Sequence, residues 1–188
     1  MPMIYNKDFH QFYKKGFSMT IHHGSSVIVE TPELHYSVRA LDFGRGFYTT
    51  TNEEQATQFA RKVHERKIRE GVADPGCFVS SYRIDYDVMK KQLSILIFNT
   101  PDEEWLDFVM ANRGEKYTGK KYDIIYGPVA NDTIYRALVG YETGLYTKKQ
   151  TIEQLAVRKL FSQMTFAMEK SLSFLHFTGY REIASWKS

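Results

Sequence analysis

One stretch decides the expected fold: DFGRGFYTTTNEEQATQFA, residues 42–60. Its opening turn, Gly44-Arg45-Gly46, allows backbone conformations and close approaches that a Cβ atom would forbid. Residues 47–51 are aromatic and β-branched, which is typical of a strand. Asn52 then fits a helix N-cap, and Gln55 three residues later completes a capping-box pattern. The stretch therefore predicts a turn, a short strand and a helix, in that order.

Periodicity predicts which side chains of this strand and helix face inward. Alternation places Tyr48 and Thr50 on one face of the strand and its other residues on the opposite face. We expect the helix to run from about residue 53 to about residue 70. Apolar residues recur along it at i, i+3, i+4 and i+7, and this spacing predicts a buried stripe of Ala56, Phe59, Ala60 and Val63.

Outside this stretch, short apolar runs are separated by turn residues and by short helical patterns. The expected strands cover residues 19–22, 27–29, 77–85, 93–98, 122–126, 162–166 and 177–183. The expected helices cover residues 4–17, 101–112, 150–160 and 168–175, with a further strand-to-helix junction at residues 129–135. Because regular βαβ alternation is lacking, we predict an α+β fold with mainly antiparallel pairing. We expect one domain over residues 1–188.

Composition limits the class of protein. The 188 residues, 43% of them hydrophobic, are enough for a domain with a sizeable core. A net charge of +3 permits a phosphate-bearing ligand or nucleic acid without arguing for either. The single cysteine, Cys77, excludes an internal disulfide framework and indicates a reducing compartment. No apolar run approaches the roughly 20 residues of a membrane span, so we expect a cytoplasmic protein. The histidines lack metal-ligand spacing, and we expect no metal.

Two patches carry the chemistry: His23-Gly24-Ser25 at the end of one strand, and Gly44-x-Gly46-Phe47-Tyr48 on another. His23 and Tyr48 are 25 residues apart in the sequence. In this order and spacing, the patches resemble the ADP-ribosyltransferase superfamily, in its diphtheria-toxin and poly(ADP-ribose)-polymerase branch. The wider pattern, over roughly residues 20–180, is similar to a bacterial family of uncharacterised, toxin-like members of that superfamily. The resemblance implies an ADP-ribosyltransferase-like split antiparallel β-sandwich with flanking helices.

The resemblance also implies a role for each residue in binding NAD. His23 would bind a ribose hydroxyl, and the Gly24 backbone would hold the nicotinamide carboxamide. Tyr48 and Phe59 would stack on the two faces of the nicotinamide ring, and Arg45 would contact the pyrophosphate. The full expected NAD-binding set is His23, Gly24, Ser25, Arg45, Gly46, Phe47, Tyr48 and Phe59.

Two positions depart from the pattern of that branch. Ala56 stands where the branch has a serine that binds the carboxamide. Thr165 stands where a late glutamate normally stabilises the positive charge that develops on the ribose. Gln163 can still form hydrogen bonds, and Asp132 is the nearest substitute carboxylate, ahead of Glu169. The expected catalytic set is therefore His23, Tyr48, Asp132 and Gln163. Two of these have plain structural alternatives, because Asp132 also fits a helix cap and Gln163 also fits a strand at the edge of the core.

The leading functional hypothesis is an NAD-dependent ADP-ribosyltransferase that modifies a protein or nucleic-acid acceptor. The family resemblance adds a bacterial toxin role, in a toxin–antitoxin or conflict system, with a small antitoxin protein as partner. One alternative is a catalytically weakened module that binds a nucleotide, a nucleic acid or a partner protein. Another is an NAD-using RNA 2′-phosphotransferase, although the arginine pattern of those enzymes is not evident. The Gly44-Arg45-Gly46 turn does not fit a Rossmann site, because it precedes a strand and lacks the third glycine.

Overall fold

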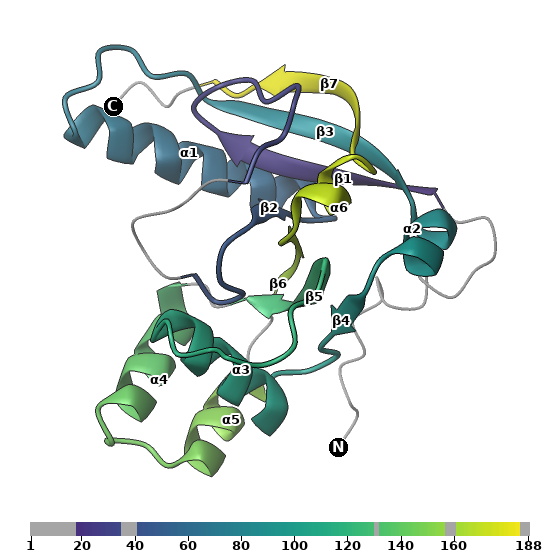
Figure 1. The fold of residues 1–188 in the computed structure, drawn as a ribbon. Coiled ribbons are helices and arrows are strands. Elements are labelled where there is room, and N and C mark those ends of the chain that lie inside the picture. The colour runs from purple at the N-terminus through teal and green to yellow at the C-terminus, as the bar shows by residue number, and fades with distance from the viewer. Residues whose placement is uncertain (1–17, 35–40, 130–131, 157–160, 185–188) are drawn as a thin grey trace.

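Two β-sheets and the helices around them make up the described part of the chain (Figure 1). This computed structural model describes residues 18–34, 41–129, 132–156 and 161–184, so the helix expected over residues 4–17 lies outside it. The strands are β1 (Ser18–Ser25), β2 (Phe47–Thr49), β3 (Phe78–Asp85), β4 (Ile95–Ile97), β5 (Ile124–Val129), β6 (Phe161–Phe166) and β7 (His176–Glu182). The helices are α1 (Glu53–Arg69), α2 (Tyr86–Gln92), α3 (Glu103–Arg113), α4 (Asp132–Glu142), α5 (Lys148–Ala156) and α6 (Glu169–Leu172).

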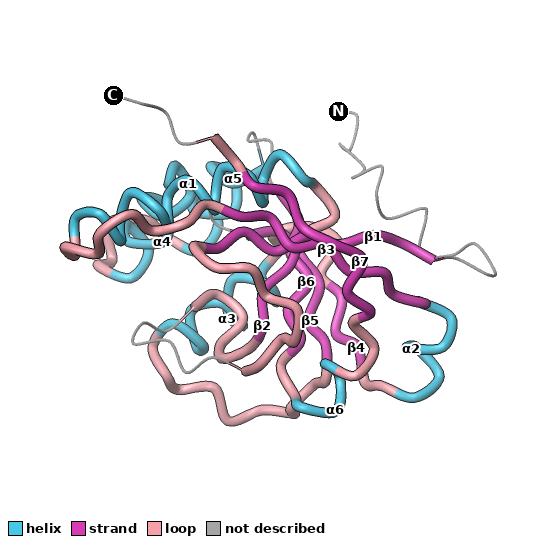
Figure 2. The backbone as a smooth tube through the Cα atoms, turned by 90° about the horizontal axis from the view of Figure 1, so that it is seen from above, coloured by secondary structure: helices cyan, strands magenta, loops and turns pink. Residues whose placement is uncertain are grey.

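The pairing of the strands is mainly antiparallel, which confirms the predicted α+β class. The first sheet has the order β1-β3-β7, with both pairs antiparallel. The second has the order β2-β6-β5-β4, in which only the β4–β5 pair is parallel. Seen from above, the strands of the first sheet run across those of the second (Figure 2). Among the described residues, no helix is long and apolar enough to cross a membrane.

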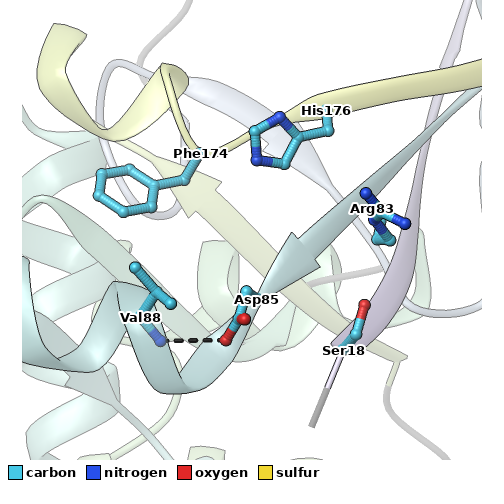
Figure 3. A pocket seen from close by; sticks show the side chains of 6 residues that line it. All are labelled: Ser18, Arg83, Asp85, Val88, Phe174 and His176. Carbon is cyan, nitrogen blue, oxygen red and sulfur yellow. Dashed lines mark hydrogen bonds between the residues drawn. The ribbon is translucent and has the colours of Figure 1, made fainter. Parts of the chain in front are cut away.

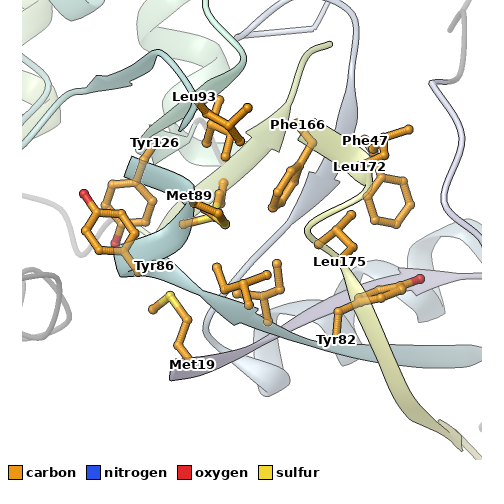
Figure 4. Packing of buried hydrophobic residues seen from close by; sticks show 14 residues of the cluster. Met19, Phe47, Tyr82, Tyr86, Met89, Leu93, Tyr126, Phe166, Leu172 and Leu175 are labelled. Atoms are coloured by element: carbon orange, nitrogen blue, oxygen red, sulfur yellow. The ribbon is translucent and has the colours of Figure 1, made fainter. Parts of the chain in front are cut away.

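The largest buried cluster fills the space between the two sheets (Figure 4). Ile21, Tyr82 and Ile84 enter it from the first sheet, and Phe47 and Phe166 enter it from the second. A second cluster, built around Trp105, lies between the second sheet and helices α3, α4 and α5. A small third cluster joins α1 to the outer face of the first sheet. The order of layers is therefore α1, first sheet, second sheet, and α3–α5.

Helix α1 begins where the sequence predicts, and for the predicted reason. The Asn52 side chain accepts a hydrogen bond from the Gln55 N–H at 3.0 Å. In a complete capping box, the Gln55 side chain would accept the Asn52 N–H. Here the Asn52 N–H donates instead to the Thr50 hydroxyl oxygen at 3.1 Å. Most of the predicted stripe is buried, but the prediction is wrong for Phe59, whose side chain is 51% exposed. The helix presents only small residues to the sheet at this point, which leaves the Phe59 ring outside the contact.

Two segments differ from the expected secondary structure. Residues 27–29 form a loop instead of a strand, and side chains satisfy its backbone: the Val29 N–H donates to the Ser80 hydroxyl, and the Val29 carbonyl accepts from the Tyr82 hydroxyl. The expected polar connection after β3 is the helix α2, which Asp85 caps by accepting the Val88 N–H at 3.0 Å. Both differences arise from hydrogen bonds that a hydrophobic pattern does not report.

Candidate functional site

The two sheets join at a bridge between His22 and Thr50. The His22 N–H donates to the Thr50 carbonyl at 2.8 Å, and the Thr50 N–H donates to the His22 carbonyl at 2.9 Å. Beyond this bridge, no further backbone hydrogen bond joins β1 to β2 among the described residues, and β1 pairs with β3 while β2 pairs with β6. Backbone groups alternate in direction along a strand, so the N–H and C=O of Gly24 point to the same edge as those of His22. The Gly24 backbone is therefore directed at the junction of the two sheets.

His23 lies at this junction with its ring fixed from two sides. Its Nδ1 atom is 2.7 Å from the Tyr48 carbonyl oxygen, and its ring centroid is 4.4 Å from that of Phe47. A carbonyl can only accept a hydrogen bond, so Nδ1 carries the proton, and Nε2 of the neutral ring is an acceptor. Phe47 was predicted to bind the ligand, but its side chain is 1% exposed in the core. The buried Phe47 ring contacts the His23 ring, so the Phe47 side chain supports His23 from the core.

Gly24 and helix α1 lie in direct backbone contact. A Cβ atom on Gly24 would lie 2.1 Å from the Ala56 carbonyl oxygen and 2.8 Å from the Ala60 nitrogen, so no larger residue fits. Phe59 belongs to the same turn of α1, and its exposed ring is available to a flat ligand without disturbing the core. Ser25, next along β1, donates its hydroxyl hydrogen to the Val27 carbonyl. It helps to shape the loop that follows the strand.

Tyr48 is held by the glycine turn that precedes β2. Its hydroxyl donates to the Gly44 carbonyl, and Gly44 has a φ of +75°, a conformation that glycine adopts without strain. Burial, followed by the nearby Asp42 carboxylate, raises the pKa of Tyr48, so the phenol remains protonated at neutral pH. The Tyr48 ring packs against the Trp105 cluster, on the opposite face of β2 from Phe47. His23 and Tyr48 therefore meet through the Tyr48 main chain, and their rings flank β2 from its two faces.

The turn that carries Arg45 and Gly46 is anchored to α3 and α4. Arg113 on α3 forms an ion pair with Asp42 at 2.8 Å, and its guanidinium lies 5.0 Å from the Tyr135 ring centroid. Tyr135 lies one turn after the start of α4, so the N-terminal end of α4 approaches this turn. Arg45 is exposed on the turn. Asp132 is the first residue of α4, and its side chain lies outside the described residues.

Gly46 is in close contact with β6. A Cβ atom there would lie 2.6 Å from Thr165 Cγ2. Thr165 pairs directly with Tyr48 across the β2–β6 ladder and is 0% exposed. Gln163, two residues earlier, shares the Tyr48 face of the sheet and is half-buried opposite Gly127. The structure thus brings Gln163 near Tyr48, and neither residue of β6 on this face carries a charge.

A pocket of about 340 Å³ opens in the loop after Ser25. It is lined by Val27, Ile28, Val29, Glu30, Thr31 and Glu33, and neither His23 nor Tyr48 is among them. No group of histidine, cysteine or carboxylate side chains among residues 18–34, 41–129, 132–156 and 161–184 could hold a metal ion. The candidate site is therefore the junction itself, formed by His23, Gly24, Tyr48 and Phe59.

Comparison with known proteins identifies a family. Residues 19–177 match the model of the family described as "Protein of unknown function (DUF3990)". The chain belongs to this family. The match runs from β1 into β7, so it includes every candidate site residue. No curated protein matches the chain, and no solved structure does.

Proposed function

We propose that this DUF3990 protein is an NAD-dependent ADP-ribosyltransferase on an ADP-ribosyltransferase-like split β-sandwich. One observation carries the proposal: beyond the His22–Thr50 bridge no further backbone hydrogen bond joins β1 to β2 among the described residues, and the Gly24 backbone faces the junction. A carboxamide needs one acceptor and one donor, and the extended backbone of a single residue supplies both. The contact with α1 also explains why glycine stands at that position.

The side chains around Gly24 suit the rest of an NAD molecule. His23 Nε2 can accept a hydrogen bond from a ribose hydroxyl, because Nδ1 is committed to the Tyr48 carbonyl. Phe59 has an exposed ring on the turn of α1 that contacts Gly24, and Tyr48, whose ring packs against the Trp105 cluster, is the second proposed stacking residue. Arg45, on the adjoining turn, can reach a pyrophosphate as an exposed cation.

The reaction breaks the bond between the nicotinamide nitrogen and ribose C1′, and the electron pair leaves with nicotinamide. An acceptor atom then forms a bond to C1′ and loses its proton. Positive charge develops on the ribose between these events, and a nearby carboxylate would stabilise it. Gln163 can orient the ribose or the acceptor by hydrogen bonds but supplies no charge, which leaves Asp132 as the proposed carboxylate.

Labelled NAD, added to the purified protein and a cell lysate, tests this function and the acceptor class together. We expect label on a macromolecule that is lost on treatment with either protease or nuclease, whichever matches the acceptor. By family resemblance we propose a bacterial toxin role in the cytoplasm, with a small antitoxin protein as partner. The absence of both label transfer and nicotinamide release would contradict the enzymatic proposal.

A second function is favoured by Thr165. This residue lies opposite Tyr48, where the family resemblance leads us to expect a charged residue, and it is fully buried. A catalytically weakened module that binds a nucleotide, nucleic acid or partner protein would tolerate an uncharged residue there. Calorimetry separates the two functions, because the module predicts binding of NAD or ADP-ribose without nicotinamide release, or no binding of NAD at all.

A further inference from the structure

A second pocket lies on the outer face of the first sheet, at the opposite end of β1 from His23 (Figure 3). Its volume is about 400 Å³, which falls within the range of small-molecule sites. His23 is five residue steps along β1 from Ser18, which corresponds to about 17 Å along a strand. The pocket is therefore distinct from the candidate site, and the inference below does not rest on the proposed function. Its lining consists of Ser18, Arg83, Asp85, Val88, Phe174 and His176.

This part of the sheet is not covered by a helix of the described chain. Helix α1 packs over the half of the outer face near Gly24 and Val79. The other half carries Ser18, Arg83 and His176, which are all exposed. A polar outer face is ordinary for an antiparallel sheet. The unusual feature is the apolar wall that Phe174 and Val88 add beside this polar face. This wall makes the polar face one side of a pocket (Figure 3).

The donors of the pocket converge and are not used elsewhere in the described chain. Arg83 and His176 are direct cross-strand partners in the β3–β7 ladder, so their side chains lie side by side. The side chain of neither residue forms a hydrogen bond or ion pair with another described residue. The Asp85 carboxylate, the negative group of the pocket, accepts the Val88 N–H as the cap of α2 (Figure 3). A guanidinium, an imidazole and the Ser18 hydroxyl thus face the same space.

We propose that this pocket binds a phosphomonoester carried by a flat ring, that is, a nucleoside monophosphate. The Arg83 guanidinium matches two phosphate oxygens in a bidentate arrangement. Ser18 and His176 donate to the remaining oxygens. The base of the nucleotide lies against Phe174, whose ring forms the apolar side of the pocket. A free nucleotide and the terminal phosphate of a nucleic acid share this chemistry.

Calorimetric titration of the full chain with adenosine monophosphate tests the proposal. Arg83→Gln removes the charge and the bidentate fork, and we expect it to weaken binding at least tenfold. Arg66→Gln, which removes an exposed charge from α1, is the matched control and leaves binding unchanged. Phe174→Leu weakens binding of adenosine monophosphate but leaves binding of inorganic phosphate unchanged. A 5′-phosphorylated oligonucleotide that binds more tightly than the free nucleotide identifies the nucleic-acid source.

Three results would overturn the inference. The first is no binding of adenosine monophosphate to the wild-type chain at millimolar concentration. The second is equal affinity in wild type and in an Arg83→Gln variant whose thermal unfolding is unchanged. The third is binding that is lost in Tyr48→Phe and retained in Arg83→Gln, because the nucleotide would then occupy the junction of the two sheets instead.

Discussion

At Gly24, even a methyl side chain would collide with the backbone of α1. The alanine variant would place its Cβ atom against the carbonyl of Ala56 and the nitrogen of Ala60. We expect Gly24→Ala to lower the free energy of unfolding by about 2 kcal/mol, because the helix must shift away from β1. Urea denaturation measures the loss. Gly114→Ala is the control, since its φ of −83° is ordinary and its Cβ would have only a 3.3 Å contact with the Met110 oxygen. An equal effect of the two variants would contradict the close contact.

Asp123 is a buried carboxylate that holds the start of β5. It accepts hydrogen bonds from the Ser94 N–H and hydroxyl at 2.7 and 2.8 Å, and it forms an ion pair with Lys170 at 3.0 Å. We expect Asp123→Asn to lower the free energy of unfolding by about 2 kcal/mol, because the amide replaces one acceptor oxygen with a donor. Asp107→Asn, in an exposed pair with Lys148, should cost no more than about 0.5 kcal/mol. Equal losses of unfolding free energy in the two variants would contradict the structural role of Asp123.

The same carboxylate makes stability depend on pH. Burial opposes its ionisation, but the Ser94 and Lys170 interactions outweigh burial, and the pKa of Asp123 is lowered on folding. The unfolded value is about 3.9, so the contribution is complete above about pH 5 and is lost as the pH falls through 3.9 towards the folded pKa. Denaturation midpoints measured from pH 6 to pH 3 should therefore fall less steeply in Asp123→Asn than in wild type. Equal pH dependence of the denaturation midpoint in wild type and Asp123→Asn would contradict a contribution of Asp123 ionisation to stability.

At the scale of elements, α1 was predictable because its signals are local. Asn52, the capping pattern and the spacing of the small apolar residues all lie within the helix and its first neighbour. Helix α2 carried a usable signal too, since Asp85 precedes Val88 and the buried Met89 at cap spacing. Residues 27–29 could not be assigned correctly from their pattern, because their backbone partners, Ser80 and Tyr82, are more than 50 residues away. Apolar composition alone does not distinguish a strand from a loop that packs on the core.

The Asn52 cap gives a direct test of the first turn of α1. Asn52→Ala removes the acceptor of the Gln55 N–H, and we expect the free energy of unfolding to fall by about 1 kcal/mol. For a chain of this length, the thermal midpoint would fall by about 2–4 °C. Asn99→Ala, in an exposed bend, provides the comparison and should leave the midpoint unchanged. A cap variant with the wild-type midpoint would show that Asn52 does not stabilise the helix.

At the scale of the whole molecule, the candidate site depends on contacts between distant segments. The sequence predicts that His23-Gly24-Ser25 ends one strand and that Tyr48 lies on another, and the His22–Thr50 bridge brings the two strands together. The position of Thr165 opposite Tyr48 spans 117 residues and is set by sheet register, which local patterns do not specify. Phe47 shows most clearly what a local sequence motif cannot predict about the site. Its motif suggested a ligand contact, whereas packing between the sheets makes it a support for His23.

Nicotinamide release from NAD tests the central claim, that the junction of the two sheets is an NAD-cleaving site. The wild-type chain should release nicotinamide, and His23→Ala and Tyr48→Ala variants that still fold should lose the activity by about 100-fold or more. The control is Tyr180→Ala, which removes an exposed ring from β7 and should retain the wild-type rate. Release that persists undiminished in both junction variants would contradict the account.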